Sequence, residues 1–232
     1  ATESGGARLA QADSWSSVAG GPTNSGRAHL NPDDAPELVW SRTLGAPLSG
    51  VAAADGLSTF VQATISERGC NLFSLSADDG RKKWCQRLPT DGPRITATLD
   101  GRGELFVPMH GGVGAVTGEG ENRWSAPVTG IPTTLALLDN RHLLTISHLG
   151  YARVINTHTG LEVSPESPLA GDFAPDEVGA GIHWCGIGTR GCPTPGPAAV
   201  DPDTGTFYVT AWPAGAPHPD LVAVRFVSGD RP

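Results

Sequence analysis

The 232-residue chain lacks the features that mark membrane-spanning and nucleic-acid-binding proteins. Only 17% of its residues are charged, the net charge is −8, and no segment is rich in Lys and Arg, so a basic groove for nucleic acid is not expected. No apolar run reaches the roughly 18 residues that a membrane-spanning helix needs. Clear 3.6-residue apolar periodicity is also missing, so long helices are not predicted.

Sequence motifs of common enzyme classes are missing as well. The chain has no Gly-x-Ser-x-Gly nucleophile motif, no HExxH, no phosphate-binding loop and no dinucleotide glycine fingerprint. Cys-x-x-Cys-His is absent, which argues against covalently attached haem. The stretch Asp201-Pro-Asp203-Thr-Gly205 resembles part of a calcium loop but lacks the remaining acidic ligands, so we interpret it as a β-turn. No catalytic residue and no metal site is predicted.

Short apolar runs between turn residues are abundant. The chain holds 31 Gly and 20 Pro, and its β-branched and aromatic residues gather in runs such as STFVQATI, GELFVP, HLLTISHL and TFYVTAW. Runs of this length between Gly, Pro, Asn and Asp are typical of strands. The sequence therefore predicts an all-β protein.

Turn glycines recur at a fixed period. Gly80, Gly120 and Gly160 are spaced 40 residues apart, and Gly229 follows after a further 69 residues. The last spacing is one period plus an insertion of about thirty residues, placed at about 165–197. Such a period is the mark of a repeat architecture.

Tryptophans follow the same period. Trp84 and Trp124 each lie four residues after a turn glycine, and Trp40 lies 44 residues before Trp84. Ser164 takes the tryptophan position in the third unit. The glycine supplies the positive φ of a hairpin turn, and we expect the tryptophan to enter the fourth strand and pack against the neighbouring unit. These side chains are predicted to dock one unit on the next rather than to bind a ligand.

Each unit also contains a small-residue strand, an Asp-containing turn and an apolar strand. The stretches SGVAAADGLSTFVQATI, ITATLDGRGELFVPMH, TTLALLDNRHLLTISH and AAVDPDTGTFYVTAW superimpose on one another. One unit therefore contains four strands in about 40 residues, which is the sheet of one propeller blade.

These units resemble the repeats of the pyrroloquinoline-quinone (PQQ)-type, quinoprotein-like β-propeller family, whose pattern is A-x-D-x-x-T-G-x-x-x-W. The pattern is carried by SLSADDGRKKW from Ser74, GAVTGEGENRW from Gly114, VINTHTG from Val154 and AVRFVSG from Ala223. The resemblance implies four-stranded antiparallel blades, of which about four are visible, in a ring that this chain leaves incomplete. The expected blade-docking residues are Trp40, Trp84, Trp124, Gly80, Gly120, Gly160 and Gly229.

The resemblance also bears on cofactors. Enzymes of this family carry an adjacent Cys-Cys pair, a tryptophan beneath the quinone and a calcium site made by Glu, Asn and Asp. No Cys-Cys pair occurs here, so we expect a non-catalytic member or a partial chain without a cofactor. The alternative is a fragment of a PQQ-dependent alcohol or sugar dehydrogenase that would bind PQQ and calcium.

Two regions are set apart from the repeats. Residues 1–36 are expected to form an N-terminal extension that wraps the propeller, because SWSSVAGGPTNSGRAHL resembles the start of such proteins. Residues 37–232 form the partial propeller, which opens on a fourth-strand element at 37–44. The chain begins without Met and with small polar residues, as expected for a mature terminus after cleavage or for a trimmed chain.

The four cysteines fall into two local pairs. Cys70 and Cys85 flank the SADDG turn, so antiparallel pairing would bring them together, and Cys185 and Cys192 bracket GIGTRG. A zinc site at the second pair with His183 is the alternative, but no close Cys-x-x-Cys supports it. Two disulfides are predicted, and they favour an oxidising compartment.

The insertion is the candidate partner surface, because departures from a regular scaffold are where function tends to lie. The alternative is a surface elaboration that caps or pads one blade. His110 and His148 follow the second strands of successive blades and would project at one face, as a shared site or as two loop histidines. The candidate surface consists of His183, Trp184, Asp172, Asp176, Glu177, His110 and His148. The predicted function is an exported binding or scaffold propeller that assembles with a protein partner. We expect the protein to be secreted, periplasmic or located at the cell surface. A lipid anchor or association with a membrane complex is a further option for its attachment.

Overall fold

The computed structural model describes residues 35, 37–54, 57–63, 69–89, 97–169, 179–186, 191–201, 203–213 and 215–225. Within these ranges the secondary structure is strands and one short helical turn, so the predicted all-β class is confirmed. None of the described helical structure has the length and apolarity to cross a membrane. The extension at 1–36 falls almost entirely outside the described residues, as do Asp172, Asp176, Glu177 and Gly229.

The first two repeat units form two separate four-stranded antiparallel sheets, each of which we call a blade. In both, the strands pair in chain order, as expected from the short turns between them. Their strands are β1 (Leu48–Ala54), β2 (Ser58–Ala63), β3 (Leu72–Ser76) and β4 (Lys82–Gln86) in blade 1, and β5 (Thr98–Leu99), β6 (Leu105–Met109), β7 (Gly112–Val116) and β8 (Asn122–Pro127) in blade 2.

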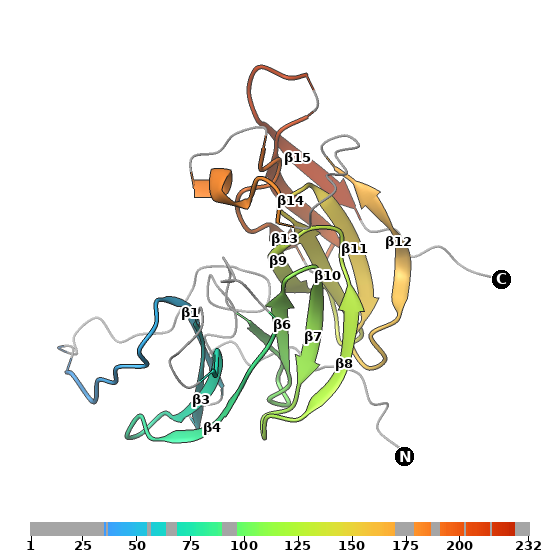
Figure 1. The fold of residues 1–232 in the computed structure, drawn as a ribbon. Coiled ribbons are helices and arrows are strands. Elements are labelled where there is room, and N and C mark those ends of the chain that lie inside the picture. Colours follow the sequence, from blue (N-terminus) through green and yellow to red (C-terminus); the bar gives the residue numbers. More distant parts are fainter. Residues whose placement is uncertain are drawn as a thin grey trace, which may run out of the picture.

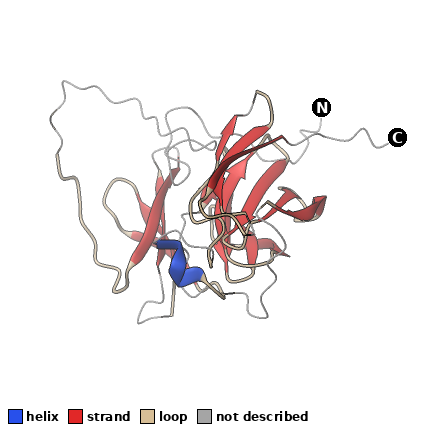
Figure 2. Ribbon diagram, turned by 90° about the horizontal axis from the view of Figure 1, so that it is seen from above, coloured by secondary structure: helices blue, strands red, loops and turns tan. Residues whose placement is uncertain are grey.

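The third and fourth units repeat the arrangement, although blade 4 has three strands in the described part of the chain. Figure 1 shows the four blades side by side in chain order, and Figure 2 shows the short helix outside the sheets. The strands are β9 (Pro132–Leu137), β10 (His142–Ser147), β11 (Tyr151–Asn156) and β12 (Glu162–Pro168) in blade 3, and β13 (Ala199–Asp201), β14 (Thr206–Ala211) and β15 (Asp220–Arg225) in blade 4.

Two boundaries differ from the sequence predictions. Residues 37–44 were expected to form a strand, but the structure assigns no strand to them. Strand β12 extends to Pro168, so the insertion leaves the sheet later than the predicted start near 165. Inside it lies the one helical turn of the described residues, η1 (Ile182–Gly186).

Apolar side chains alternate between the two faces of the blades, so blades 2 and 3 each pack on both of their neighbours. In β6, Leu105 and Val107 pack towards blade 1, whereas Phe106 packs towards blade 3. In β10, Leu143 packs back on blade 2 and Leu144 packs forward on blade 4. This period of two follows from the pleat of a strand, and it places the core between the blades rather than at one centre.

One ion pair in blade 2 is poorly solvated. Glu104 lies just before β6, and a carboxylate oxygen lies 3.3 Å from Nη1 of Arg123 in β8. Burial raises the pKa of the Glu104 carboxyl above its ordinary value of 4.5, an effect that Arg123 opposes and nearby Asp100 reinforces. The folded protein therefore holds this proton to a higher pH than the unfolded chain does.

The first prediction concerns this carboxyl. Because the folded state binds the proton more tightly, the group lowers the free energy of unfolding as pH rises from 4.5 through its raised folded pKa. Glu104→Gln removes the titration and keeps an oxygen for Arg123. We expect the free energy of urea unfolding of Glu104→Gln, relative to that of wild type, to increase as the pH is raised from 4 to 7. A relative loss over that interval would contradict the assignment.

Candidate partner-binding surface

The tryptophans of the repeat lie at the junctions between blades. Trp84, in β4 of blade 1, lies over the turn glycine of blade 2: a Cβ placed on Gly120 would come within 2.9 Å of Trp84 Cδ2. Its Nε1 donates to the carbonyl of Gly118 at 2.6 Å. The indole also packs on Phe60, with 5.9 Å between ring centroids. The tryptophan of one blade therefore caps the β-turn of the next.

Two further tryptophans repeat this contact. A Cβ on Gly160 would lie 2.7 Å from Trp124 Cδ2, and a Cβ on Gly80 would lie 2.6 Å from Trp40 Cε3. Nε1 of Trp124 donates to Thr157 O at 2.9 Å. Nε1 of Trp40 donates to Ala77 O at 2.7 Å. The structure thus places each of the three predicted docking tryptophans on one of the predicted turn glycines, while Gly229 lies outside the described residues.

Both predicted disulfides are formed. Cys70, two residues before β3, is joined to Cys85 in β4, with their Cα atoms 5.8 Å apart. Cys185 and Cys192 join η1 to the segment that returns to the propeller core, with Cα atoms 5.0 Å apart. No free cysteine remains in the chain, so the alternative of a zinc site at Cys185 and Cys192 does not fit this structure.

Glycines allow the insertion to fold tightly around η1. Gly181 has φ +80°, and a Cβ there would lie 1.9 Å from the carbonyl oxygen of Gly191. A Cβ on Gly191 would come within 2.8 Å of Trp184 Cδ1. The two glycines thereby leave room for the close approach of the chain at 191 to η1, and the Trp184 indole packs on the His183 ring with 4.6 Å between centroids.

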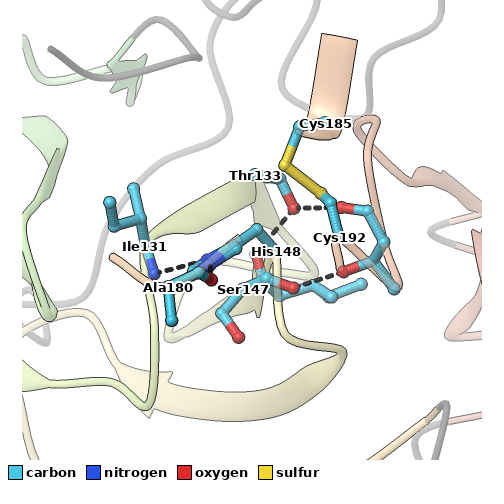
Figure 3. The surroundings of a disulfide bond; sticks show 9 residues. Ile131, Thr133, Ser147, His148, Ala180, Cys185 and Cys192 are labelled. Atoms are coloured by element: carbon cyan, nitrogen blue, oxygen red, sulfur yellow. Dashed lines mark hydrogen bonds between the residues drawn. A yellow bond between two sulfur atoms is a disulfide. The ribbon is translucent and has the colours of Figure 1, made fainter. Parts of the chain in front are cut away.

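His148 anchors the insertion to blade 3 (Figure 3). The backbone N–H of Ile131 donates to His148 Nδ1 at 3.0 Å, so the ring proton is on Nε2, which donates to Ala180 O at 2.8 Å. The side chain is fully buried. His148 is therefore an internal anchor and not part of an exposed site shared with His110. It agrees with the other alternative, a loop histidine that satisfies nearby backbone groups.

A second group of hydrogen bonds holds the return segment. The Thr194 hydroxyl donates to Ser147 O, and its N–H donates to His148 O at 3.2 Å. Thr133 Oγ1 donates to Thr194 O at 3.0 Å. The sequence did not reveal these contacts, because threonine hydroxyls in a loop carry no recognisable spacing.

Exposed side chains remain on the outer side of this anchored insertion. Trp184 retains 45% of its accessible surface, and His183 is exposed beside it. His110 is also exposed and lies next to the insertion, because a Cβ on Gly179 would lie 3.2 Å from His110 Cε1. These three residues form what we call the insertion surface: His110, His183 and Trp184.

The second prediction tests the anchor. His148→Leu would leave the buried Ile131 N–H without its acceptor, which costs about 2 kcal/mol, and would leave Ala180 C=O, which is only half-buried, without its donor at a smaller cost. We expect the free energy of urea unfolding to fall by about that amount. His110→Leu is the matched control at the same place in blade 2, and it should cost clearly less. Equal losses would show that the two ring hydrogen bonds of His148 contribute little.

Comparisons with known proteins address the fold. No family model matches the chain. The chain is 28% identical over 218 residues to Protein Rv3035 of Mycobacterium tuberculosis (strain ATCC 25618 / H37Rv), in an alignment that covers 94% of this chain and 53% of the relative. The chain thus spans about half the length of the curated relative that it matches.

Three solved structures resemble it at low identity. A europium-containing methanol dehydrogenase has a TM-score of 0.62 and 16% identity, and the match covers 93% of this chain and 47% of that one. Quinohemoprotein alcohol dehydrogenase from Comamonas testosteroni has 0.60 and 14%, covering 88% and 36%. BamB from Moraxella catarrhalis has 0.51 and 18%, covering 71% and 44%. The fold is a β-propeller. Its four described blades are part of a ring, as the sequence predicted.

The cysteines and acidic residues of the described propeller differ from the adjacent Cys-Cys pair and the calcium site expected of a quinone enzyme. Both cysteine pairs are separated in sequence, by 15 and 7 residues, so the adjacent pair of the quinone enzymes is missing. Within the described ranges, no three His, Cys, Asp or Glu side chains lie close enough to hold a metal ion. Asp201 instead accepts hydrogen bonds from Asp203 N and Thr204 Oγ1, at 3.0 and 2.7 Å, as expected for a turn. That the protein binds no cofactor stays a prediction.

Proposed function

We propose that this propeller is a protein-binding scaffold that works outside the cytoplasm and contacts its partner through the insertion surface. Its supporting observation is the exposed His183–Trp184 pair, which is held in place by a disulfide and by hydrogen bonds to blade 3. A rigid, half-exposed tryptophan loses little conformational freedom on binding and is the residue type most enriched at interface hot spots.

The proposed compartment rests on the disulfides. Two local disulfides and no free thiol are expected where the environment is oxidising, and they are rare in the cytosol. Whether a lipid anchor or a membrane complex holds the protein there is part of the same proposal. BamB and the two dehydrogenases share the fold with this chain, and a shared fold does not choose between binding and catalysis.

The third prediction tests the surface. A photoreactive aromatic residue at position 184 of the full chain should cross-link to one protein species in an extracytoplasmic extract of the source organism. The same residue at Leu161, which is 68% exposed in the turn between β11 and β12, should not. Trp184→Ala should then weaken binding of the purified partner by at least about 2 kcal/mol, roughly thirtyfold.

Three outcomes would count against the proposal. Identical cross-linking at both positions would show that the capture is unspecific. Unchanged affinity of Trp184→Ala, with an unchanged unfolding midpoint, would remove the insertion surface from the interface. A quinone absorbance band after incubation with PQQ and calcium, together with alcohol-dependent dye reduction, would favour the dehydrogenase alternative.

A further inference from the structure

A fully buried histidine side chain joins the insertion to blade 3. His148 directly follows β10, and its side chain has no exposed surface. Figure 3 shows its two ring hydrogen bonds: Nδ1 accepts from Ile131 N–H at 3.0 Å, and Nε2 donates to Ala180 O at 2.8 Å. Both partners are uncharged backbone groups. They fit the neutral ring, in which one nitrogen accepts and the other donates.

A further proton cannot be added to this ring where it lies. A protonated imidazole donates from both nitrogens, so Nδ1–H would point at the Ile131 N–H, which is itself a donor. The ring has little room to shift, because a Cβ on Gly130 would already lie 3.1 Å from Nδ1. A buried charge without its hydrogen bond is strongly unfavourable. The charged ring therefore has to leave its site and reach water.

The part of the structure that can move to let the ring out is the turn over Nε2. Ala180 lies in the half-buried turn 179–181 in front of η1, which belongs to no sheet. Ile131, on the other side of the ring, is fixed to blade 3, because its carbonyl accepts from His148 N–H at 2.9 Å. The disulfide between Cys185 and Cys192 keeps η1 attached to the return segment. Loss of the Ala180 bond thus frees the turn without opening a blade.

Other ionisable groups also lie around this ring. The contacts of the described residues place four of them on the neighbouring elements: His110 of the β6–β7 turn, Tyr151 and Arg153 of β11, and Glu166 of β12. Tyrosine and arginine side chains titrate well above pH 7 in model peptides. A pH effect of His148 therefore has to be separated from effects of His110, which lies beside Gly179, and of Glu166, which accepts from Thr129 N–H.

We propose that protonation of His148 releases the insertion from blade 3, so that acid shifts the balance from an anchored to a released insertion. The anchored form holds the neutral ring, whereas the released form exposes the ring to water, where histidine takes up a proton near pH 6.5. Because the released form binds more protons, it gains on the anchored form as the pH falls. Between pH 7 and pH 5 the ratio of released to anchored copies should rise about 25-fold.

The consequence for partner binding rests on the proposed function. His183 and Trp184 keep their place beside His110 as long as the turn 179–181 is anchored. Release removes this arrangement, so the insertion surface is presented at neutral pH and withdrawn in acid. The release is measured on the free protein, so a failure to find a partner would overturn the proposed function and leave the release standing.

Hydrogen exchange of the 232-residue chain, followed for single amides by NMR, tests the release. The protection factor of the Ile131 amide should fall about 25-fold from pH 7 to pH 5, because its opening requires the His148 ring to leave. The control amide is that of Val128, which donates to Gly111 O at 2.9 Å and should keep its protection factor. His148→Gln supplies an acceptor and a donor that do not titrate, so it should abolish the pH dependence at Ile131.

Two further variants and one spectrum complete the test. His110→Gln and Glu166→Gln remove the neighbouring ionisable groups, and each should keep the fall at Ile131. Ring ¹⁵N shifts of the wild-type protein require no variant to fold, and they should show His148 gaining a proton only as far as the protection of Ile131 is lost.

Three results would overturn the proposal. The first is an Ile131 protection factor that does not change between pH 7 and pH 5. The second is a fall that persists in His148→Gln, or that disappears in His110→Gln or Glu166→Gln. The third is a His148 ring with protons on both nitrogens while the Ile131 amide stays protected.

Discussion

Replacing Trp124 by alanine should lower the free energy of unfolding by about 3 kcal/mol. The indole joins blade 2 to blade 3, because it packs on Phe106 of blade 2 with 5.9 Å between ring centroids and lies over Gly160 of blade 3. Truncation removes this apolar contact and leaves Thr157 O without the donor that now lies 2.9 Å away. Because the apolar contact and the hydrogen bond are both lost at one blade junction, the fall in the free energy of unfolding should exceed that caused by a surface substitution.

Urea unfolding followed by circular dichroism, with the disulfides kept oxidised, measures this loss. Trp184→Ala is the matched control, because it removes the same side chain from the insertion rather than from a blade junction. Trp124→Phe should fall between wild type and Trp124→Ala, since it keeps an aromatic ring and loses the Nε1 donor. A loss for Trp124→Ala no larger than that of the control would show that the indole does not hold the blades together.

The sequence predicted the parts of the fold that repeat about every 40 residues along the chain. Gly80, Gly120 and Gly160 recur because each hairpin needs a positive φ, which they adopt at 66°, 91° and 72°. Cys70 and Cys85 could be paired because they are symmetric about one such turn. A repeated local requirement leaves a repeated residue, and a single chain is then enough to detect it.

The contacts that break the period could not be predicted. His148 has the same position in the sequence pattern as His110, yet one is buried under the insertion and the other is exposed. What differs is the chain between β12 and β13, whose course depends on tertiary hydrogen bonds such as that from His148 to Ala180. The helical turn η1 has five residues, too few for a periodic signal.

The segment at 37–44 shows the limit of reasoning from pattern alone. Its tryptophan predicted a fourth strand, and the structure does place Trp40 over Gly80 as in the other blades. Strand pairing is absent because a strand needs a neighbouring edge, and the described residues offer none beside it. The side-chain contact and the backbone pairing are thus separate requirements, and the described residues meet the first one at 37–44 but not the second.

Gly160→Ala should cost about 3 kcal/mol, well above the effect of an alanine at most turn glycines. The positive φ of 72° contributes about 1 kcal/mol of this, because an L side chain is strained there. The remainder comes from Trp124, whose Cδ2 would lie 2.7 Å from the new methyl group and cannot move away without separating the blades.

Two comparisons separate these contributions. Gly103 has φ +83° with nothing within 4 Å of a built Cβ, so Gly103→Ala should show the backbone strain alone, about 1 kcal/mol. In the Trp124→Ala background the clash is gone, so Gly160→Ala should likewise cost only about 1 kcal/mol there. The double-mutant cycle in urea unfolding should therefore give a coupling of about 2 kcal/mol between positions 124 and 160. Additive losses at the two positions would mean that the indole yields freely, and the close approach of Trp124 to the turn would then not be what aligns blade 3 on blade 2.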